Sequence, residues 1–511
     1  MAQPAAPDST PDDEDSPDYV ARILKGSGSV FSGSMIGKVV GFTLSLVLGR
    51  GLGSVLFGKY TLGLTVLRIA QSVSTLGLQN GIVRFGAPSY ERGETARVKG
   101  TFLAGGGLGV LTALAIGVAL FLGSHWLACT VFQDPAMEQV VEVFACGLPF
   151  YVLTYLLSRM ARALSKMQVD VLLDSILQPA FFLVLVGGVL AVGQGFTAAL
   201  YAFLLSTVLA AGAGIYALYR LFPPLLSSLP ADVEIRSLLR FSLPIVGVTL
   251  ASIGLTYTDR IMLGILSTSE SVGLYQIAAR LSEQLRFVLF AITAAFSPVI
   301  SDLYHNDRIS KLNDLYANTV RWILLTTLPA AVLLIAFAPQ VMGIWGPDYR
   351  AGATLLRVLA VAHIVTAGVG TVGHMLQMSD HQDFVFAVNT SMAVLNVGLN
   401  WLFINVYGAL GAALATGFIQ VLGNVLQSIA LYRFTGIQPF RPNLWKPLAA
   451  ASLGTLFAWS VYRMLAAPMT WVVGVPGTLV IYVGALLSFG LTPKDRSILQ
   501  ALWSRVKTRI G

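Results

Sequence analysis

Nine charged residues lie inside stretches of the sequence that are otherwise apolar, and these residues are the strongest candidates for ligand binding. They are Lys38, Arg68, Asp259, Arg260, Arg280, Glu283, Arg286, Arg321 and Arg357. An ionised side chain at the centre of a bilayer costs at least ~2.5–3.5 kcal/mol, so such residues normally face protein or a water-filled cavity. Cations outnumber anions by seven to two in this set. We therefore expect an anionic ligand, and phosphate suits the set because arginine makes bidentate hydrogen bonds to its oxygens.

Four of the cations are predicted to bind substrate. Lys38 and Arg68 have no acidic residue near them in the sequence, which favours ligand binding over an ion pair. Arg280 and Arg286 complete the predicted cationic cavity.

Asp259, Arg260 and Glu283 are predicted to form ion pairs or a gate. Arg280 and Glu283 are one helical turn apart and can pair, whereas Asp259 and Arg260 can pair with each other or with neighbours. For these four residues a purely structural ion pair explains the sequence as well as a direct contact with substrate does. Polar residues such as Gln71, Asn80, Gln276, Asn389 and Asn396 either recognise a glycan or hold helices together.

The usual motifs of cofactor and metal chemistry indicate no site. The stretch GVGTVG at 368–373 matches G-x-G-x-x-G literally. No strand precedes it, however, and it lies inside an apolar stretch, which argues against a dinucleotide site. Cys129 and Cys146 lack the spacing of a metal or redox site. We expect no cofactor, no metal ion and no enzymatic activity.

The chain as a whole is too apolar for a soluble protein. Of its 511 residues, 55% are hydrophobic and only 11% are charged, whereas soluble domains carry about a quarter charged residues. Repeated stretches of about 20 apolar residues are long enough to cross a hydrocarbon core, and they predict an all-α integral membrane protein. The net charge is +8, and the basic residues lie mostly in alternate loops. Membrane topology explains this pattern better than nucleic-acid binding does.

We predict about fourteen transmembrane helices in the plasma (inner) membrane. Their approximate ranges are 29–50, 59–82, 101–123, 139–161, 170–192, 196–219, 238–266, 272–297, 317–338, 351–377, 384–404, 408–432, 445–466 and 470–491. An even number of helices places both termini on one side. The basic residues of alternate loops and of the C-terminal tail place that side in the cytoplasm.

The two halves of the chain resemble each other. Gly195 opens GFTAALYAF and Gly408 opens GALGAALATGF; the helices end in ALYR at Arg220 and Arg433, so both pairs lie 213 positions apart. A six-helix repeat in one direction predicts two similar lobes with a binding cleft near the midplane. The predicted segments are a disordered cytoplasmic tail (1–18), an N-terminal six-helix lobe (19–220), a cytoplasmic linker (221–237), a C-terminal six-helix lobe (238–434), two extra transmembrane helices (435–491) and an amphipathic cytoplasmic helix (492–511).

Several stretches resemble a known family. LLRFSLPIVGVTLASIGLTYTDRIMLG (238–264) and VGLYQIAARL (272–281) are similar to the seventh and eighth helices of the polysaccharide (oligosaccharide) flippases. These flippases belong to the multidrug/oligosaccharidyl-lipid/polysaccharide exporter superfamily. Residues 56–85, 344–364 and 395–417 fit the same family, and their order and spacing together are fairly specific.

The resemblance implies a substrate and a site. The family moves an oligosaccharide on a polyprenyl phosphate or pyrophosphate from the cytoplasmic to the outer leaflet. Its peptidoglycan-precursor relatives hold basic residues on helices one, two and eight, and Lys38, Arg68 and Arg280 occupy comparable spans. A polysaccharide polymerase or a glycosyltransferase is an implied partner, and membrane lipid surrounds the protein.

The hypothesis is therefore a flippase that works by alternating access, and two alternatives stay open. A cation-coupled multidrug or metabolite exporter of the same fold should carry acidic residues deep in its N-terminal lobe. Only Glu142, Asp170 and Asp174 are found there, all close to the ends of spans. A membrane scaffold without transport activity would not need so many arginines inside spans.

Overall fold

The computed structural model describes residues 17–440, 442–464 and 469–490, and every regular element among them is a helix. The all-α fold class predicted from the apolar stretches is thereby confirmed. The predicted tail at 1–18 lies outside the described residues except for its last two positions. The predicted amphipathic helix at 492–511 lies outside them entirely.

The chain forms two compact units, which we call unit 1 (Met1–Ile253) and unit 2 (Gly254–Gly511). The division falls inside helix α9 (Ile235–Leu266). The predicted linker at 221–237 lies within unit 1, because the linker and the first part of α9 pack onto other helices of that unit.

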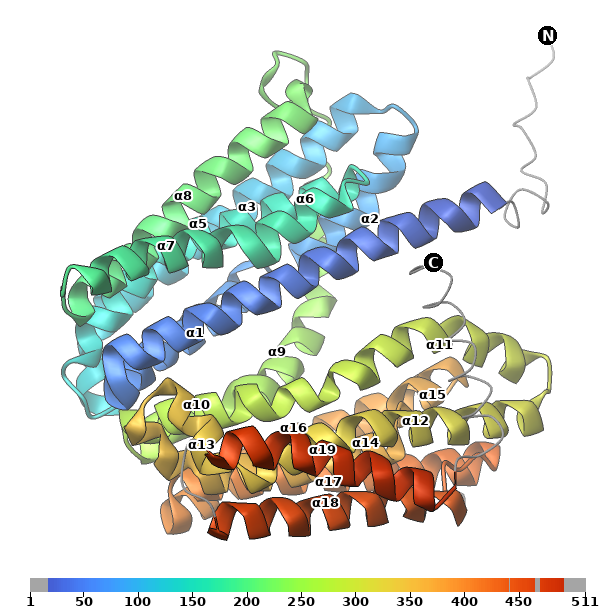
Figure 1. The fold of residues 1–511 in the computed structure, drawn as a ribbon. Helices are drawn as coiled ribbons and strands as arrows, with labels where there is room; N and C mark the ends of the chain where they lie inside the picture. Colours follow the sequence, from blue (N-terminus) through green and yellow to red (C-terminus); the bar gives the residue numbers. More distant parts are fainter. Residues whose placement is uncertain (1–16, 441, 465–468, 491–511) are drawn as a thin grey trace, which may run out of the picture. The chain divides into compact units, whose positions relative to one another are not determined.

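Figure 1 shows the helices of both units, coloured along the chain. In unit 1 they are α1 (Pro17–Ser74), α2 (Leu78–Glu91), α3 (Thr95–Leu122), α4 (Ser124–Trp126), the π-helix η2 (Leu127–Val131), α5 (Met137–Ala163), α6 (Met167–Val171), the π-helix η3 (Leu172–Leu177), α7 (Gln178–Ala191), α8 (Phe196–Leu221), the 3₁₀ turn η4 (Pro223–Leu226) and the first part of α9. 

Unit 2 begins within α9. Its further helices are α10 (Ser269–Glu283), η5 (Gln284–Arg286), α11 (Phe287–His305), α12 (Ile309–Ala336), α13 (Ala338–Met342), η6 (Gly343–Trp345), η7 (Pro347–Gly352), α14 (Ala353–Val369), α15 (Val372–Met378), α16 (Gln382–Tyr407), α17 (Ala409–Thr435), η8 (Pro442–Leu444), α18 (Trp445–Met464) and α19 (Met469–Ser488). The four η elements of this unit are 3₁₀ turns.

Helix α1 consists of two helices that meet at Gly53. Its 58 residues are far more than the ~20 that one crossing of a bilayer requires. Gly53 has a φ of 74° and a ψ of 175°, a conformation that glycine adopts readily because it has no Cβ. The break lies between the predicted spans at 29–50 and 59–82.

Ten helices of the described residues are long and apolar enough to cross a membrane, or eleven if the two parts of α9 form one span. The long helix α1 is counted once, although it covers two predicted spans. The predicted span at 272–297 is divided between α10 and α11 by the turn η5. The molecule is therefore a multi-pass membrane protein, and the count of fourteen remains a prediction.

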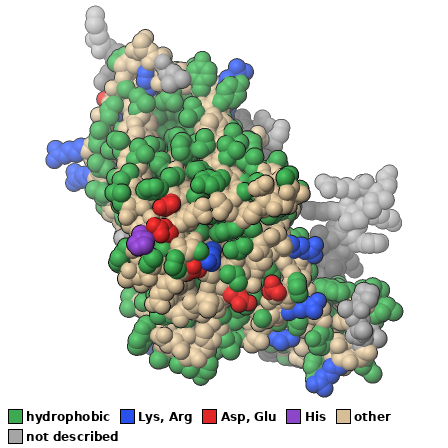
Figure 2. Space-filling view, turned by 90° about the vertical axis from the view of Figure 1, so that its left-hand side faces the viewer, with side chains coloured by type: hydrophobic (Ala, Val, Ile, Leu, Met, Phe, Trp, Pro, Cys, Tyr) green, Lys and Arg blue, Asp and Glu red, His purple; other side chains and the backbone are tan. Residues whose placement is uncertain are grey.

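The surface of the protein fits this conclusion. In Figure 2 hydrophobic side chains cover much of the visible face, and charged side chains are few. Leu122, Val192 and Met464 are 78%, 76% and 83% exposed. Apolar side chains presented in such numbers are unfavourable in water and favourable against lipid tails.

Each unit has its own apolar core. In unit 1 the ring of Tyr60 lies 5.7 Å from the rings of Phe144 and Phe182 and 6.1 Å from that of Phe203, so that α1, α5, α7 and α8 meet around one aromatic cluster. In unit 2 the last two helices pack onto α12, and the hydroxyl of Tyr482 donates a hydrogen bond of 3.0 Å to the carbonyl of Leu325.

The linker is fastened to the start of α3 by polar contacts. Lys99 is only 6% exposed, and its ammonium group donates to the carbonyls of Ser227 and Leu229 at 2.5 and 3.0 Å. The backbone N–H of Asp232 donates to the carbonyl of Ala96 at 3.0 Å. These bonds satisfy a buried ammonium group that would otherwise be strongly unfavourable.

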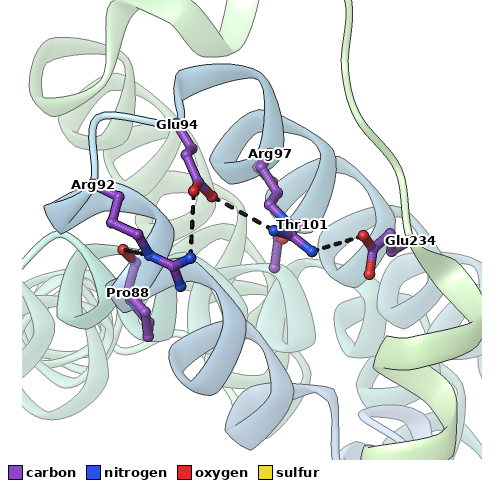
Figure 3. A network of polar contacts seen from close by, with 6 residues as sticks. All are labelled: Pro88, Arg92, Glu94, Arg97, Thr101 and Glu234. Carbon is purple, nitrogen blue, oxygen red and sulfur yellow. Dashed lines mark hydrogen bonds and ion pairs between the residues drawn. The ribbon is translucent and has the colours of Figure 1, made fainter. Parts of the chain in front are cut away.

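An ion-pair network extends this attachment (Figure 3). Arg97 lies 2.7 Å from Glu234, which directly precedes α9, and 3.7 Å from Glu94. Arg92 in turn lies 3.4 Å from Glu94. The network thereby connects the α2–α3 turn to the beginning of α9. Near the start of α9, Leu238 continues the contact by packing with Leu78 and Ala104.

Gly100 should be essential for this attachment. A Cβ at this position would lie 1.7 Å from the carbonyl oxygen of Asp232, so the linker must move if any side chain is introduced. We expect Gly100→Ala to destabilise the protein by about 1–3 kcal/mol, as overpacking usually does. The measurement is the midpoint of thermal unfolding of the purified protein in detergent. Gly107→Ala on the same helix is the matched control, because nothing lies within 4 Å of its added Cβ. Equal midpoints for the two variants would contradict the prediction.

Candidate functional site

The two predicted site residues of unit 1 both lie on α1, on opposite sides of Gly53. The side chains of Lys38 and Arg68 are exposed on the surface of this unit, next to the buried residues Gly37 and Leu67. Arg280 and Arg286 belong to unit 2, and a chamber that all four residues share remains a prediction.

In unit 2 the adjacent residues Asp259 and Arg260 have different partners. A helix advances by 100° per residue, so neighbouring side chains point to different surroundings. Asp259 is 4% exposed and accepts a hydrogen bond of 2.5 Å from the hydroxyl of Tyr275. Arg260 instead donates to the side-chain oxygen of Gln276 at 2.6 Å. The sequence left open whether Asp259 and Arg260 pair with each other or with neighbouring residues, and the contacts in the structure are with neighbouring residues, Tyr275 and Gln276.

Asp259 is the centre of a buried polar cluster that joins four helices. Besides Tyr275 of α10, the amide of Asn396 on α16 donates to the carboxylate at 3.3 Å. Because the single phenolic proton of Tyr275 goes to Asp259, the hydroxyl of Thr416 on α17 must donate to Tyr275 across their 3.0 Å contact. Asn400 lies one turn beyond and donates to Asn396 at 2.9 Å. Charge-assisted bonds of this kind are the strong ones in a protein interior.

Arg260 is held in place by neutral groups and faces one acid. Its Nη1 donates to the carbonyl of Thr256 at 2.6 Å, in addition to the bond from Nε to Gln276. Its Nη2 lies 3.8 Å from Glu283, which is longer than a hydrogen bond. The side chain of Arg260 is 12% exposed and that of Glu283 is 54% exposed. The structure therefore brings two of the predicted gating residues, Arg260 and Glu283, close together, and Glu283 is the more exposed of the two.

The two arginines predicted to bind substrate in unit 2 are both half-buried. Arg280 lies one turn after Gln276 and just before Glu283, so that these three residues share one face of α10. The guanidinium of Arg286, in η5, lies 4.9 Å from the centre of the Phe290 ring. The Nε atom of Arg286 is buried, and its N–H donates a hydrogen bond to no group among the described residues.

Sequence reasoning missed a second cluster of buried charges, in unit 1. Its arginines, Arg159 and Arg162, both belong to α5, and Arg159 is only 8% exposed. Arg162 lies 2.5 Å from Asp170, and Arg159 lies 2.9 Å from Asp174. Two of the three acids that a cation-coupled exporter could use in this lobe, Asp170 and Asp174, are therefore already matched by arginines. The i, i+3 spacing of the two arginines and the i, i+4 spacing of the two aspartates were the available signal.

Several polar residues that the sequence left ambiguous connect helices. Gln276 and Asn396 have the contacts given above, and Asn389 accepts a bond of 3.1 Å from Gln427. The described part of the chain holds no group of three or more His, Cys, Asp or Glu side chains that would bind a metal ion. What the arrangement in unit 2 offers is charge: the buried carboxylate of Asp259, the positioned guanidinium of Arg260, and the half-buried Arg280 and Arg286.

Comparison with known proteins gives two family matches. The model of a family described as polysaccharide biosynthesis protein matches residues 23–304, and that of MatE matches residues 244–402. The first match spans more than half of the chain and includes all seven predicted site residues.

Two curated relatives come from Haloferax volcanii. The probable flippase AglR is 24% identical over 246 residues, which are 47% of this chain and 52% of the relative. The probable low-salt glycan biosynthesis flippase Agl15 is 24% identical over 210 residues, or 41% of this chain and 44% of the relative. The chain thus spans about half the length of the curated relatives it matches.

Solved structures share the fold. The lipid II flippase MurJ in its inward closed conformation matches with a TM-score of 0.69 and 14% identity, over 93% of this chain and 100% of that one. A multidrug resistance MATE family transporter in its inward-facing conformation matches with a TM-score of 0.62 and 16% identity, over 80% of this chain and 98% of that one. At these identities the likeness establishes the fold alone.

The Asp259 cluster should contribute strongly to stability. Tyr275→Phe removes the hydroxyl that bonds both Asp259 and Thr416, and leaves a buried carboxylate with one donor fewer. Hydrogen bonds to charged groups contribute about 1.5–3 kcal/mol, so the melting midpoint in detergent should fall clearly. Tyr407→Phe serves as control, since Tyr407 is 57% exposed. A midpoint for Tyr275→Phe equal to that of the control would show that the cluster is not stabilising.

Proposed function

We propose that this chain, which belongs to the polysaccharide biosynthesis protein family, is a flippase for a lipid-linked oligosaccharide. The substrate is carried on a polyprenyl phosphate or pyrophosphate and moves from the cytoplasmic to the outer leaflet. One observation carries the proposal: the family match at 23–304 contains the whole set of predicted site residues, in which cations exceed anions. A transporter of this kind needs no catalytic residue. The names of the two curated relatives, both probable flippases, support the same conclusion.

The mechanism we propose is alternating access. The anionic head group binds Lys38, Arg68, Arg280 and Arg286 in an inward-open cleft between the two lobes, while the polyprenyl tail stays in lipid. The lobes then rock about the site and open it to the other side. Moving negative charge outward across a membrane that is negative inside gains ~2.3 kcal/mol per charge per 100 mV, so the membrane potential can drive the step.

The surroundings of the protein follow from this role. We place it in the plasma (inner) membrane with both termini in the cytoplasm, on the strength of the basic residues in alternate loops. A polysaccharide polymerase and glycosyltransferases are the proposed partners, because they would consume and supply the lipid-linked substrate.

Replacing the cations of the proposed site should abolish transport. We expect Arg68→Ala and Arg280→Ala each to lose complementation of a surface-glycan defect while inserting normally into the membrane. Each substitution removes a positive charge that the head group needs and that water cannot replace inside the cleft. Membrane insertion is checked by immunoblot of the membrane fraction.

The matched controls come from the repeat. Arg220→Ala and Arg433→Ala each remove an exposed arginine at equivalent ends of α8 and α17, and both should complement fully. Full complementation by both Arg68→Ala and Arg280→Ala would contradict the assignment of these residues to the site.

A second candidate function, a cation-coupled multidrug or metabolite exporter, is favoured by one observation. Asp259 is a buried carboxylate whose partners Tyr275 and Asn396 are both neutral, a setting in which the carboxylate could take up a proton. Against it stand Asp170 and Asp174 of unit 1, which are paired with arginines.

Proteoliposomes separate the two functions. We expect a sodium or proton gradient to leave a cationic dye unmoved, because a cavity rich in arginine repels cations. The readout is dye fluorescence, with Asp259→Asn measured alongside the unaltered protein. Gradient-driven dye export that disappears in Asp259→Asn would establish the exporter in place of the flippase.

A further inference from the structure

The contact between Arg260 and Glu283 differs from the other ion pairs between neighbouring helical segments. In unit 1, Arg162 and Asp170 lie 2.5 Å apart and Arg159 and Asp174 lie 2.9 Å apart. Arg260 and Glu283 are separated by 3.8 Å, beyond hydrogen-bond range. More than half of the Glu283 side chain is exposed, whereas that of Asp170 is 2% exposed. Glu283 is therefore a loosely held counterion.

Arg260, by contrast, is firmly positioned. A guanidinium has five N–H donors, and two of them are taken by the side-chain oxygen of Gln276 and the carbonyl of Thr256. Both acceptors are neutral, so they fix the orientation of the guanidinium without cancelling its charge. Its Nη2 edge is directed toward Glu283. This is the arrangement of a preorganised anion-binding group, for which the entropy of ordering is already lost before the ligand arrives.

A second arginine lies on the helix face that approaches this edge. Arg280 lies on the same face of α10, between Gln276 and Glu283, which both approach Arg260. A phosphate at the position of the Glu283 carboxylate would meet the Nη2 edge of Arg260 and have Arg280 beside it. Phosphate offers more oxygen acceptors than a carboxylate and can pair with a guanidinium through two parallel bonds.

We propose that Glu283 is the resident counterion of Arg260 and is displaced when the phosphate or pyrophosphate of the substrate arrives. Arg260 then becomes a direct ligand of the head group, and Glu283 tunes its affinity by competing for the same guanidinium edge. The inference rests on the proposed function and deepens it, since it names the group that recognises the phosphate and the acid that regulates its access. The fixed acid Asp259 takes no part in this exchange because its oxygens are bound by Tyr275 and Asn396.

The test compares binding by the full-length protein in nanodiscs. Two probes are titrated separately, a polyprenyl pyrophosphate without sugar and inorganic pyrophosphate. Glu283→Gln should tighten binding about fivefold, the size expected when an exposed competing ion pair is removed. Arg260→Gln should weaken binding, and the Glu283→Gln effect should disappear in the double variant. Glu270→Gln, an exposed glutamate at the start of the same helix, is the matched control and should bind as the unaltered protein does.

The outcomes separate this inference from the proposed function. Tighter binding of the lipid probe alone, or of both probes, by Glu283→Gln supports the exchange and shows whether the lipid tail is needed. If the unaltered protein binds a probe but Glu283→Gln binds it no more tightly, the exchange is wrong and the flippase proposal stands. An equal gain in the Arg260→Gln background also overturns it. If the unaltered protein binds neither probe and complements no surface-glycan defect, both proposals fail together.

Discussion

A charge that leaves water must be compensated by the protein, and this requirement organises the polar contacts of both units. Asp259 receives donors from α10 and α16, while Asp170 is enclosed by arginines of α5. The ammonium group of Lys99 donates hydrogen bonds to two carbonyls of the linker. In a low-dielectric surrounding each of these bonds is strong, and each missing one would be correspondingly unfavourable. The helices of this protein are thus joined at a small number of polar points within otherwise apolar contacts.

The same requirement separates charges that are satisfied from charges that are available. The arginines of α5 are matched by acids, so they add to the fold and leave little for a ligand. Arg260 is oriented by neutral acceptors, and the acid that it faces, Glu283, lies 3.8 Å away. The fold itself does not decide between a lipid flippase and a drug exporter, because solved examples of both share it. The excess of cations over anions among the predicted site residues is what supports the proposed phosphate-bearing substrate.

Much of the fold could be predicted because it depends on local properties of the sequence. Apolar stretches identified most spans, and the family resemblance is confirmed by the match at 23–304. Contacts between distant segments were beyond such reasoning. Asn396 lies 137 positions from its partner Asp259, and Thr416 lies 141 positions from its partner Tyr275, so no local pattern points to these contacts. The cluster around Arg159 was missed because the two aspartates that enclose this residue come from the following helical segments. That Lys38, Arg68, Arg280 and Arg286 form one binding site remains a prediction, because two of them belong to unit 1 and two to unit 2.

The attachment of residues 227–234 to α3 has a consequence for dividing the protein into halves. The sequence repeat suggests a cut in the 221–237 linker, but a cut before Ser227 would separate Lys99 from its two acceptors and Arg97 from Glu234. The N-terminal fragment would also lose Leu238 and expose the glycines of α2 and α3 against which it lies. Two co-expressed halves should therefore reassemble best when the N-terminal half extends to the middle of α9, near residue 253.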